Sequence, residues 1–113
     1  MSEEEKEYKG RAASKGIASG MAAYIISPSE YHKRDFSKGN VLVTKMTDVD
    51  YLPLMRKASA VVTQYGGKFS HAAVICRQLK KPCVVGLVTG ITMLDGNKVT
   101  VNGTTGQITR EVV

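Results

Sequence analysis

The chain of 113 residues has no tryptophan, two cysteines and two histidines. Its seven aromatic residues are five tyrosines and two phenylalanines, too few to suggest a surface on which nucleic-acid bases stack. Cys76 and Cys83 lie seven positions apart in apolar stretches. Together with the histidines they match no ligand spacing of a structural zinc site. We therefore expect no metal site and two buried free thiols, as in a reducing compartment.

Long apolar runs are also missing, since none approaches the length that crosses a bilayer. The first ten residues are acidic and polar, MSEEEKEYKG, unlike a secretory signal. We expect a cytoplasmic protein that makes no contact with a membrane. The formal net charge is +6, and its lysines and arginines are scattered along the chain. This charge fits either an ordinary basic surface or an anionic partner such as a nucleotide. Because no nucleic-acid-binding motif accompanies it, we expect no nucleic-acid partner.

The length allows one domain, which we expect at residues 13–113 after a flexible, charged segment at residues 1–12. Apolar runs bounded by turn residues predict strands, at residues 17–26, 41–44, 60–63 and 83–85. Asp-Gly and Asn-Gly turns predict a β-hairpin at residues 95–108. One helix is expected to begin at Asp48 or Asp50 and run to about Ser59. A second begins at Ser70 and is ended by Pro82. The fold class is α/β, with a mixed sheet, two or three helices and a C-terminal hairpin.

The segment whose residue types suggest a reactive site is residues 66–74, Gly-Gly-Lys-Phe-Ser-His-Ala-Ala-Val. Gly66 and Gly67 permit a tight turn after a strand, and Ser70 takes the cap position of the following helix. His71 then stands where free backbone amides and the positive end of the helix dipole favour an anion and disfavour the imidazolium. A histidine at a helix start is nevertheless more often a surface or capping residue. These residues alone leave both interpretations open.

Residues 61–79 and 82–86, VVTQYGGKFSHAAVICRQL and PCVVG, closely resemble the mobile domain of phosphoenolpyruvate-utilising enzymes. That family includes pyruvate phosphate dikinase and phosphoenolpyruvate synthase. Its signature is a Gly-Gly loop, a Ser-His-Ala-Ala turn, an Arg-x-Leu helix and a Pro-x-Val-Val-Gly strand. Further similarity at residues 13–20, 39–44, 52–55 and 94–106 extends the resemblance over about residues 10–110. Lys15 replaces a proline that the family usually has.

The resemblance implies the swivelling β/β/α fold and identifies His71 as a residue that is transiently phosphorylated at Nε2. Gly66, Gly67 and Ser70 would frame the phosphate site, and Thr63 would orient the loop. Arg77 would either meet the phosphate or a partner carboxylate, or be an exposed helix charge.

The resemblance also implies partners, because 113 residues hold no nucleotide-binding loop and no barrel. No cofactor is expected on this domain. An ATP-grasp domain or subunit would bind ATP and magnesium, and a barrel domain or subunit would bind phosphoenolpyruvate or pyruvate. The chain would be a component of a phosphotransferase, incomplete alone, with its N-terminal segment as a tether. The Met1 start favours a separate subunit over an excised domain.

Two residues depart from the family pattern. Phe69 stands where relatives usually have a threonine, whose reversible phosphorylation inactivates some dikinases, so that control is expected to be absent. His32 matches nothing and is interpreted as a solvated side chain. The alternatives are a non-catalytic binding or regulatory module, which Phe69 favours, and a thiol enzyme using Cys76 with His71. The thiol enzyme is disfavoured because Cys76 lies on the apolar stripe of its helix, away from the face that carries His71.

Overall fold

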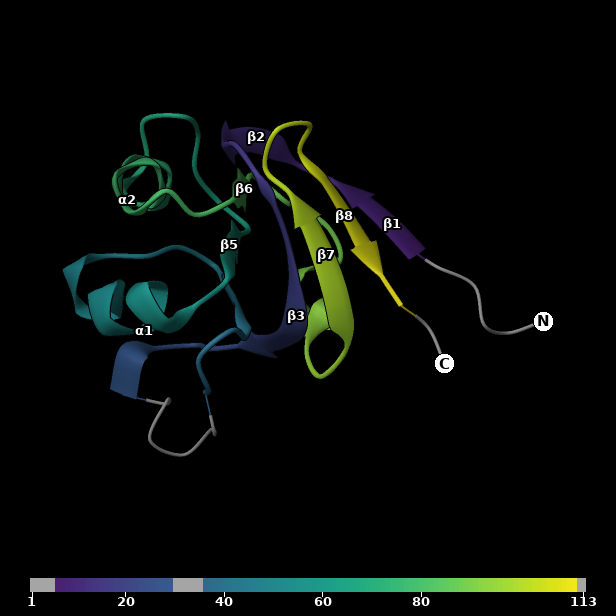
Figure 1. Cartoon of the computed structure of the whole chain (residues 1–113), viewed down its shortest axis with the longest axis horizontal. Helices are drawn as coiled ribbons and strands as arrows, with labels where there is room; N and C mark the ends of the chain where they lie inside the picture. Colours follow the sequence, from purple (N-terminus) through teal and green to yellow (C-terminus); the bar gives the residue numbers. More distant parts are fainter. Residues whose placement is uncertain (1–5, 30–35, 112–113) are drawn as a thin grey trace.

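The computed structural model describes residues 6–29 and 36–111. Eight strands form one mixed sheet in the order β1-β8-β7-β3-β4-β5-β6-β2. Their bounds are β1 Lys6–Lys9, β2 Arg11–Ser14, β3 Ile17–Tyr24, β4 Val41–Thr44, β5 Ala60–Thr63, β6 Cys83–Val85, β7 Lys98–Asn102 and β8 Gln107–Arg110. Two α-helices, α1 Leu52–Lys57 and α2 His71–Leu79, lie on one side of the parallel strands (Figure 1). Two 3₁₀ turns, η2 Val49–Tyr51 and η3 Ile91–Leu94, complete the described elements.

The central strands β3 to β6 run parallel to one another, and β4, β5 and β6 are buried on both faces. Leu42, Val61 and Val85 pack toward the helices in one core cluster. The alternate residues, among them Val43 and Val84, pack against β7, β8 and η3 in a second cluster. A strand that is covered on both faces needs apolar residues at every position, which is why these strands are uninterrupted runs in the sequence. The layers are therefore β/β/α, and the predicted mixed α/β fold is confirmed.

The local predictions for strands and helices are confirmed with small shifts of their ends. The Asp48 carboxylate accepts a hydrogen bond from the Asp50 amide at 2.9 Å and caps η2. The turn continues directly into α1, with Pro53 near its start. The predicted hairpin is present as the antiparallel pair β7 and β8. Residues 27–29 and 36–39, between β3 and β4, contain no strand, and His32 lies outside the described residues.

The prediction of a flexible segment at residues 1–12 is wrong for residues 6–12. Strand β1 pairs antiparallel with β8 at one edge of the sheet, and β2 pairs with β6 at the other. Their charged side chains suggested a frayed segment, but an edge strand can expose such side chains while its backbone pairs. Tyr8 also packs against the second core cluster. Residues 6–12 are thus part of the sheet and cannot act as a tether.

Both cysteines are buried and free, as predicted. Within residues 6–29 and 36–111, three or more His, Cys, Asp or Glu side chains nowhere gather as a metal site would require. The same part of the chain contains no helix with the length and apolar character needed to cross a membrane.

Candidate functional site

The loops that follow β4 and β5 meet at the carboxyl edge of the parallel strands. Here the Gln64 amide donates to the Thr44 carbonyl at 3.1 Å, and the Tyr65 amide donates to the Lys45 carbonyl at 2.9 Å. The second loop ends where α2 begins, at His71. The carboxyl edge of a parallel sheet is the usual place for ligand binding in α/β proteins, and His71 lies there.

The imidazole of His71 is held by Thr47, a residue that sequence analysis did not single out. The Thr47 Oγ1 lies 2.9 Å from the His71 Nδ1. Thr47 is buried, with 8% of its surface exposed, so its hydroxyl has a fixed position. The ring of His71 is itself partly exposed. No group in the described part of the chain bonds to its other nitrogen, Nε2, which leaves that atom available to a ligand.

The Gly66–Gly67 turn brings Ser70 against the start of the loop. Gly66 has φ of +124°, and a Cβ at this position would lie 2.9 Å from the Ser70 Oγ. The Gly67 carbonyl accepts two hydrogen bonds, one from the Ser70 amide at 3.0 Å and one from the Ser70 hydroxyl at 2.8 Å. Only glycine combines this φ with the close approach.

Ser70 occupies the predicted cap position of α2, but its hydroxyl does not cap the helix. Among the residues that the structure describes, no side chain accepts a hydrogen bond from the amides of the first turn of α2. Unsatisfied amides at the positive end of a helix attract anions. The start of α2 therefore carries donors next to His71.

Thr63 and Arg77 hold the two ends of the loop that precedes His71. The fully buried Thr63 donates from Oγ1 to the Tyr65 carbonyl at 2.8 Å. Arg77 donates from Nε to the Ala13 carbonyl at 2.8 Å and from Nη2 to the Lys68 carbonyl. Arg77 thus links β2, α2 and the loop, a positioning role that neither sequence-based alternative included.

Large apolar side chains are exposed around this edge of the sheet. They follow three successive parallel strands, as Met46 (62% exposed) after β4, Tyr65 (53%) and Phe69 (80%) after β5, and Val88 (70%) after β6. We call these four residues the apolar rim. The Lys68 ammonium lies 5.5 Å from the centroid of the Phe69 ring, within cation–π range. Exposed apolar residues grouped at a functional edge are typical of a surface that contacts a partner.

The cysteines lie apart from this chemistry. Cys76 and Cys83 are completely buried. A hydrogen bond with Cys76 that favours the protonated thiol, together with burial, raises the pKa of Cys83 well above its ordinary value. A buried thiol held in its protonated form is a poor nucleophile, so the geometry gives no support to a thiol enzyme.

Comparison with known proteins agrees with these features. Residues 36–106 match the family described as PEP-utilising enzyme, mobile domain. The chain is 42% identical, over its whole length, to a probable phosphoenolpyruvate synthase of Staphylothermus marinus. It is 43% identical over 93% of its length to the phosphoenolpyruvate synthase of Escherichia coli. In both cases the match covers only 14% of the synthase.

Among solved structures, the solution structure of an Enzyme I protein superposes with a TM-score of 0.56 at 26% identity. That match covers 65% of this chain and 31% of the other. The resemblance drawn from residues 61–86 is therefore confirmed over most of the chain. The chain belongs to the family of PEP-utilising enzyme mobile domains.

Proposed function

We propose that this chain is a phosphoryl carrier on which the Nε2 atom of His71 is transiently phosphorylated. The observation that supports this most directly is the bond between Thr47 and the Nδ1 of His71. When Nδ1–H donates to the threonine oxygen, the neutral ring carries its lone pair on Nε2. That atom has no partner within the described residues and belongs to the first residue of α2.

In the transfer step, the Nε2 lone pair attacks the phosphorus of a bound donor. An N–P bond forms as the P–O bond to the leaving group breaks, and the leaving oxygen keeps the bonding electrons. The proton on Nδ1 stays in place, and Thr47 accepts its hydrogen bond throughout. The phosphoryl group adds a charge of about −2, which the amides at the start of α2 stabilise. The reverse step passes the group to an acceptor oxygen.

The donor and acceptor sites belong to partners. An ATP-grasp domain or subunit holds ATP and magnesium, and a barrel domain or subunit holds phosphoenolpyruvate or pyruvate. The apolar rim around His71 provides the surface on which these partners dock in turn. Phe69 has no hydroxyl, so phosphorylation at this position cannot switch the carrier off.

The test is transfer in trans from the E. coli phosphoenolpyruvate synthase, with its own phosphoryl-accepting histidine replaced, and ATP labelled at the β- or γ-phosphate. We expect acid-labile, alkali-stable label on this chain. The matched variant is His71→Asn, because an asparagine can keep a contact with Thr47 but has no atom at the Nε2 position. Label that persists in His71→Asn would remove His71 from the proposed role. A folded wild-type chain that takes up no label from this donor or from labelled phosphoenolpyruvate would favour the non-catalytic module.

A further inference from the structure

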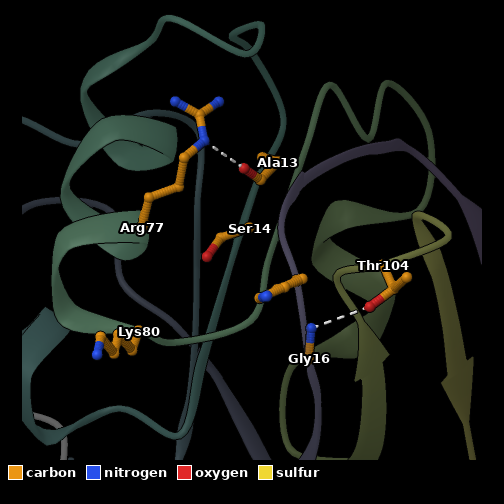
Figure 2. Close-up of a pocket in the computed structure, with 7 residues that line it drawn as sticks. Ala13, Ser14, Gly16, Arg77, Lys80 and Thr104 are labelled. Carbon is orange, nitrogen blue, oxygen red and sulfur yellow. Dashed lines mark hydrogen bonds between the residues drawn. The ribbon is translucent and has the colours of Figure 1, made fainter.

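A second site lies beside the C-terminal half of α2, away from the carboxyl edge that holds His71. A cavity of about 830 Å³ opens between the β2–β3 turn, α2 and the β7–β8 turn. Figure 2 shows side chains from all three segments around it. The volume falls in the range of small-molecule pockets. Nine residues of helix, on the order of 13 Å along its axis, separate Lys80 in this pocket from His71.

The pocket is lined by cations without a compensating acid. Lys15, Arg77 and Lys80 contribute to its wall, and no carboxylate of the described residues does. Two of the three come from the end of α2 and one from the turn between β2 and β3. Several charges of one sign around a cavity raise the local concentration of a counter-ion. Such a pocket therefore selects a multiply charged anion.

Two hydroxyl groups in the pocket have hydrogen-bonding capacity left. Ser14 is 94% buried, since 6% of its surface is exposed, and within the described residues its hydroxyl bonds to nothing. Figure 2 shows this hydroxyl between Arg77 and Lys80. The Thr104 Oγ1 accepts a bond from the Gly16 amide at 3.0 Å, which leaves the hydroxyl hydrogen free to donate. The Ser14 hydroxyl is not among the buried atoms without a partner, so solvent in the pocket reaches it, and a ligand oxygen would take the place of water there.

Lys80 has a left-handed backbone conformation, which is uncommon for a residue other than glycine. Lys80 has φ of +60° and is the one residue other than glycine with a positive φ in the described part of the chain. It ends α2, where its amide donates to the Arg77 and Cys76 carbonyls. Glycine is the usual residue at such a helix end. A residue in this conformation at the wall of a cavity points to a functional constraint on its side chain.

We propose that this pocket binds a small phosphorylated molecule through its phosphate oxygens. Lys15, Lys80 and Arg77 neutralise the charge, while Ser14 and Thr104 donate hydrogen bonds to the oxygens. Lysine, arginine and hydroxyl donors without acids form a donor set that suits phosphate. The cavity is larger than one phosphate ion needs, so the expected ligand is a pyrophosphate or a nucleotide. This binding does not depend on phosphoryl transfer at His71. Arg77 nevertheless links the two sites, because it also donates to the Lys68 carbonyl in the loop before His71.

The experiment is an NMR titration of the full chain at physiological salt, which screens weak surface attraction. Pyrophosphate is the first probe, and ADP and AMP are the second arm that separates an inorganic ligand from a nucleotide. We expect saturable shifts of the amides at residues 14–16, 80 and 104, with a millimolar or tighter dissociation constant. The double variant Lys15→Gln with Lys80→Gln should weaken binding at least about tenfold. Ser14→Ala should weaken it roughly fivefold.

The matched control is Lys9→Gln with Lys98→Gln, which removes the same charge from exposed lysines outside the pocket. The control should keep the wild-type affinity within about twofold. Equal weakening in both double variants would show that only net charge matters and would overturn the proposal. Shifts confined to residues 68–72, or no saturation at millimolar concentrations, would also overturn it. Binding of an acidic peptide in place of every phosphate probe would reassign the pocket to a protein partner. The His71→Asn variant should bind pyrophosphate as the wild type does, whether or not His71 is a carrier.

Discussion

Replacing Thr47 by valine tests how the protein selects the reactive nitrogen of His71. Valine has nearly the shape of threonine but no hydroxyl, so Thr47→Val removes the 2.9 Å contact with Nδ1 and changes little else. Because Thr47 is 8% exposed, water cannot easily take the place of its hydroxyl. We expect the neutral ring to lose part of its preference for the tautomer with the proton on Nδ1.

The size of the effect follows from the value of one hydrogen bond. A net contribution of about 1 kcal/mol corresponds to a factor of roughly 5 in the tautomer ratio. The rate of phosphorylation at Nε2 should fall by less than this factor, since it depends on the fraction of rings with a lone pair on that atom, and the fraction changes less than the ratio. The free energy of unfolding should fall by no more than about 1 kcal/mol.

The tautomer ratio is measurable in the isolated chain by long-range ¹H–¹⁵N correlation spectra of His71 at alkaline pH. The control is Thr47→Ser, which keeps the hydroxyl and should keep the wild-type ratio. The reasoning fails if the wild-type ring is protonated mainly on Nε2. It also fails if Thr47→Val and Thr47→Ser give the same ratio.

Three other perturbations have outcomes that the structure determines. Gly66→Ala should lower the free energy of unfolding by about 1–3 kcal/mol, because φ at Gly66 is +124° and the new Cβ would lie 2.9 Å from the Ser70 hydroxyl. Its control is Gly67→Ala, where a Cβ would have no neighbour within 4 Å. This control should change the free energy of unfolding by less than about 0.5 kcal/mol in chemical denaturation. Phe69→Ala should leave the melting temperature nearly unchanged, since Phe69 is 80% exposed, yet slow phosphoryl transfer from a docked partner; an unchanged transfer rate would exclude Phe69 from the docking surface. A hydrogen bond with Cys76 that favours the protonated thiol, and burial, raise the pKa of Cys83 above its value in the unfolded chain, so the stability that this thiol contributes is fully present below the unfolded pKa and is lost as pH rises above about 9. Cys83→Ala should flatten that alkaline decline, and an equally steep decline would show that another group causes it.

Much of the fold was predictable because the parallel strands β4, β5 and β6 are buried on both faces. Residues 41–44, 60–63 and 83–85 are apolar at almost every position, and such short runs between turn residues are typical of parallel strands. The Gly66–Gly67 turn could also be predicted from the sequence, since the positive φ at Gly66 demands glycine. Where burial or backbone conformation allows only a few residue types at a position, the residue found there predicts the local structure.

The edge strands and the partner of His71 were not predictable in the same way. Strand β1 has three charged residues and Tyr8, and its pairing with β8 joins residues that are about a hundred positions apart. Thr47 is a polar residue in a loop, and nothing in its neighbours marks it as a hydrogen-bond partner. It could have been found only by combining two predictions, namely that β4 and β5 are adjacent and that their following loops meet at one edge.

The adjacency of β4 and β5 also explains why Thr47 and His71 have fixed positions although Thr47 belongs to a loop and His71 directly follows one. Thr44 and Thr63 are paired in register at the ends of β4 and β5, and neighbouring strands lie about 4.8 Å apart. Both strands are completely buried, so this spacing is fixed by the packing of the core. Thr47 follows Thr44 by three residues, and the Thr63 hydroxyl ties down the loop that leads to His71. The rigid pair of strands therefore fixes the distance between Thr47 and His71. Loss of the Thr63 hydroxyl should shift the position of the His71 ring, although no residue that contacts the ring is replaced.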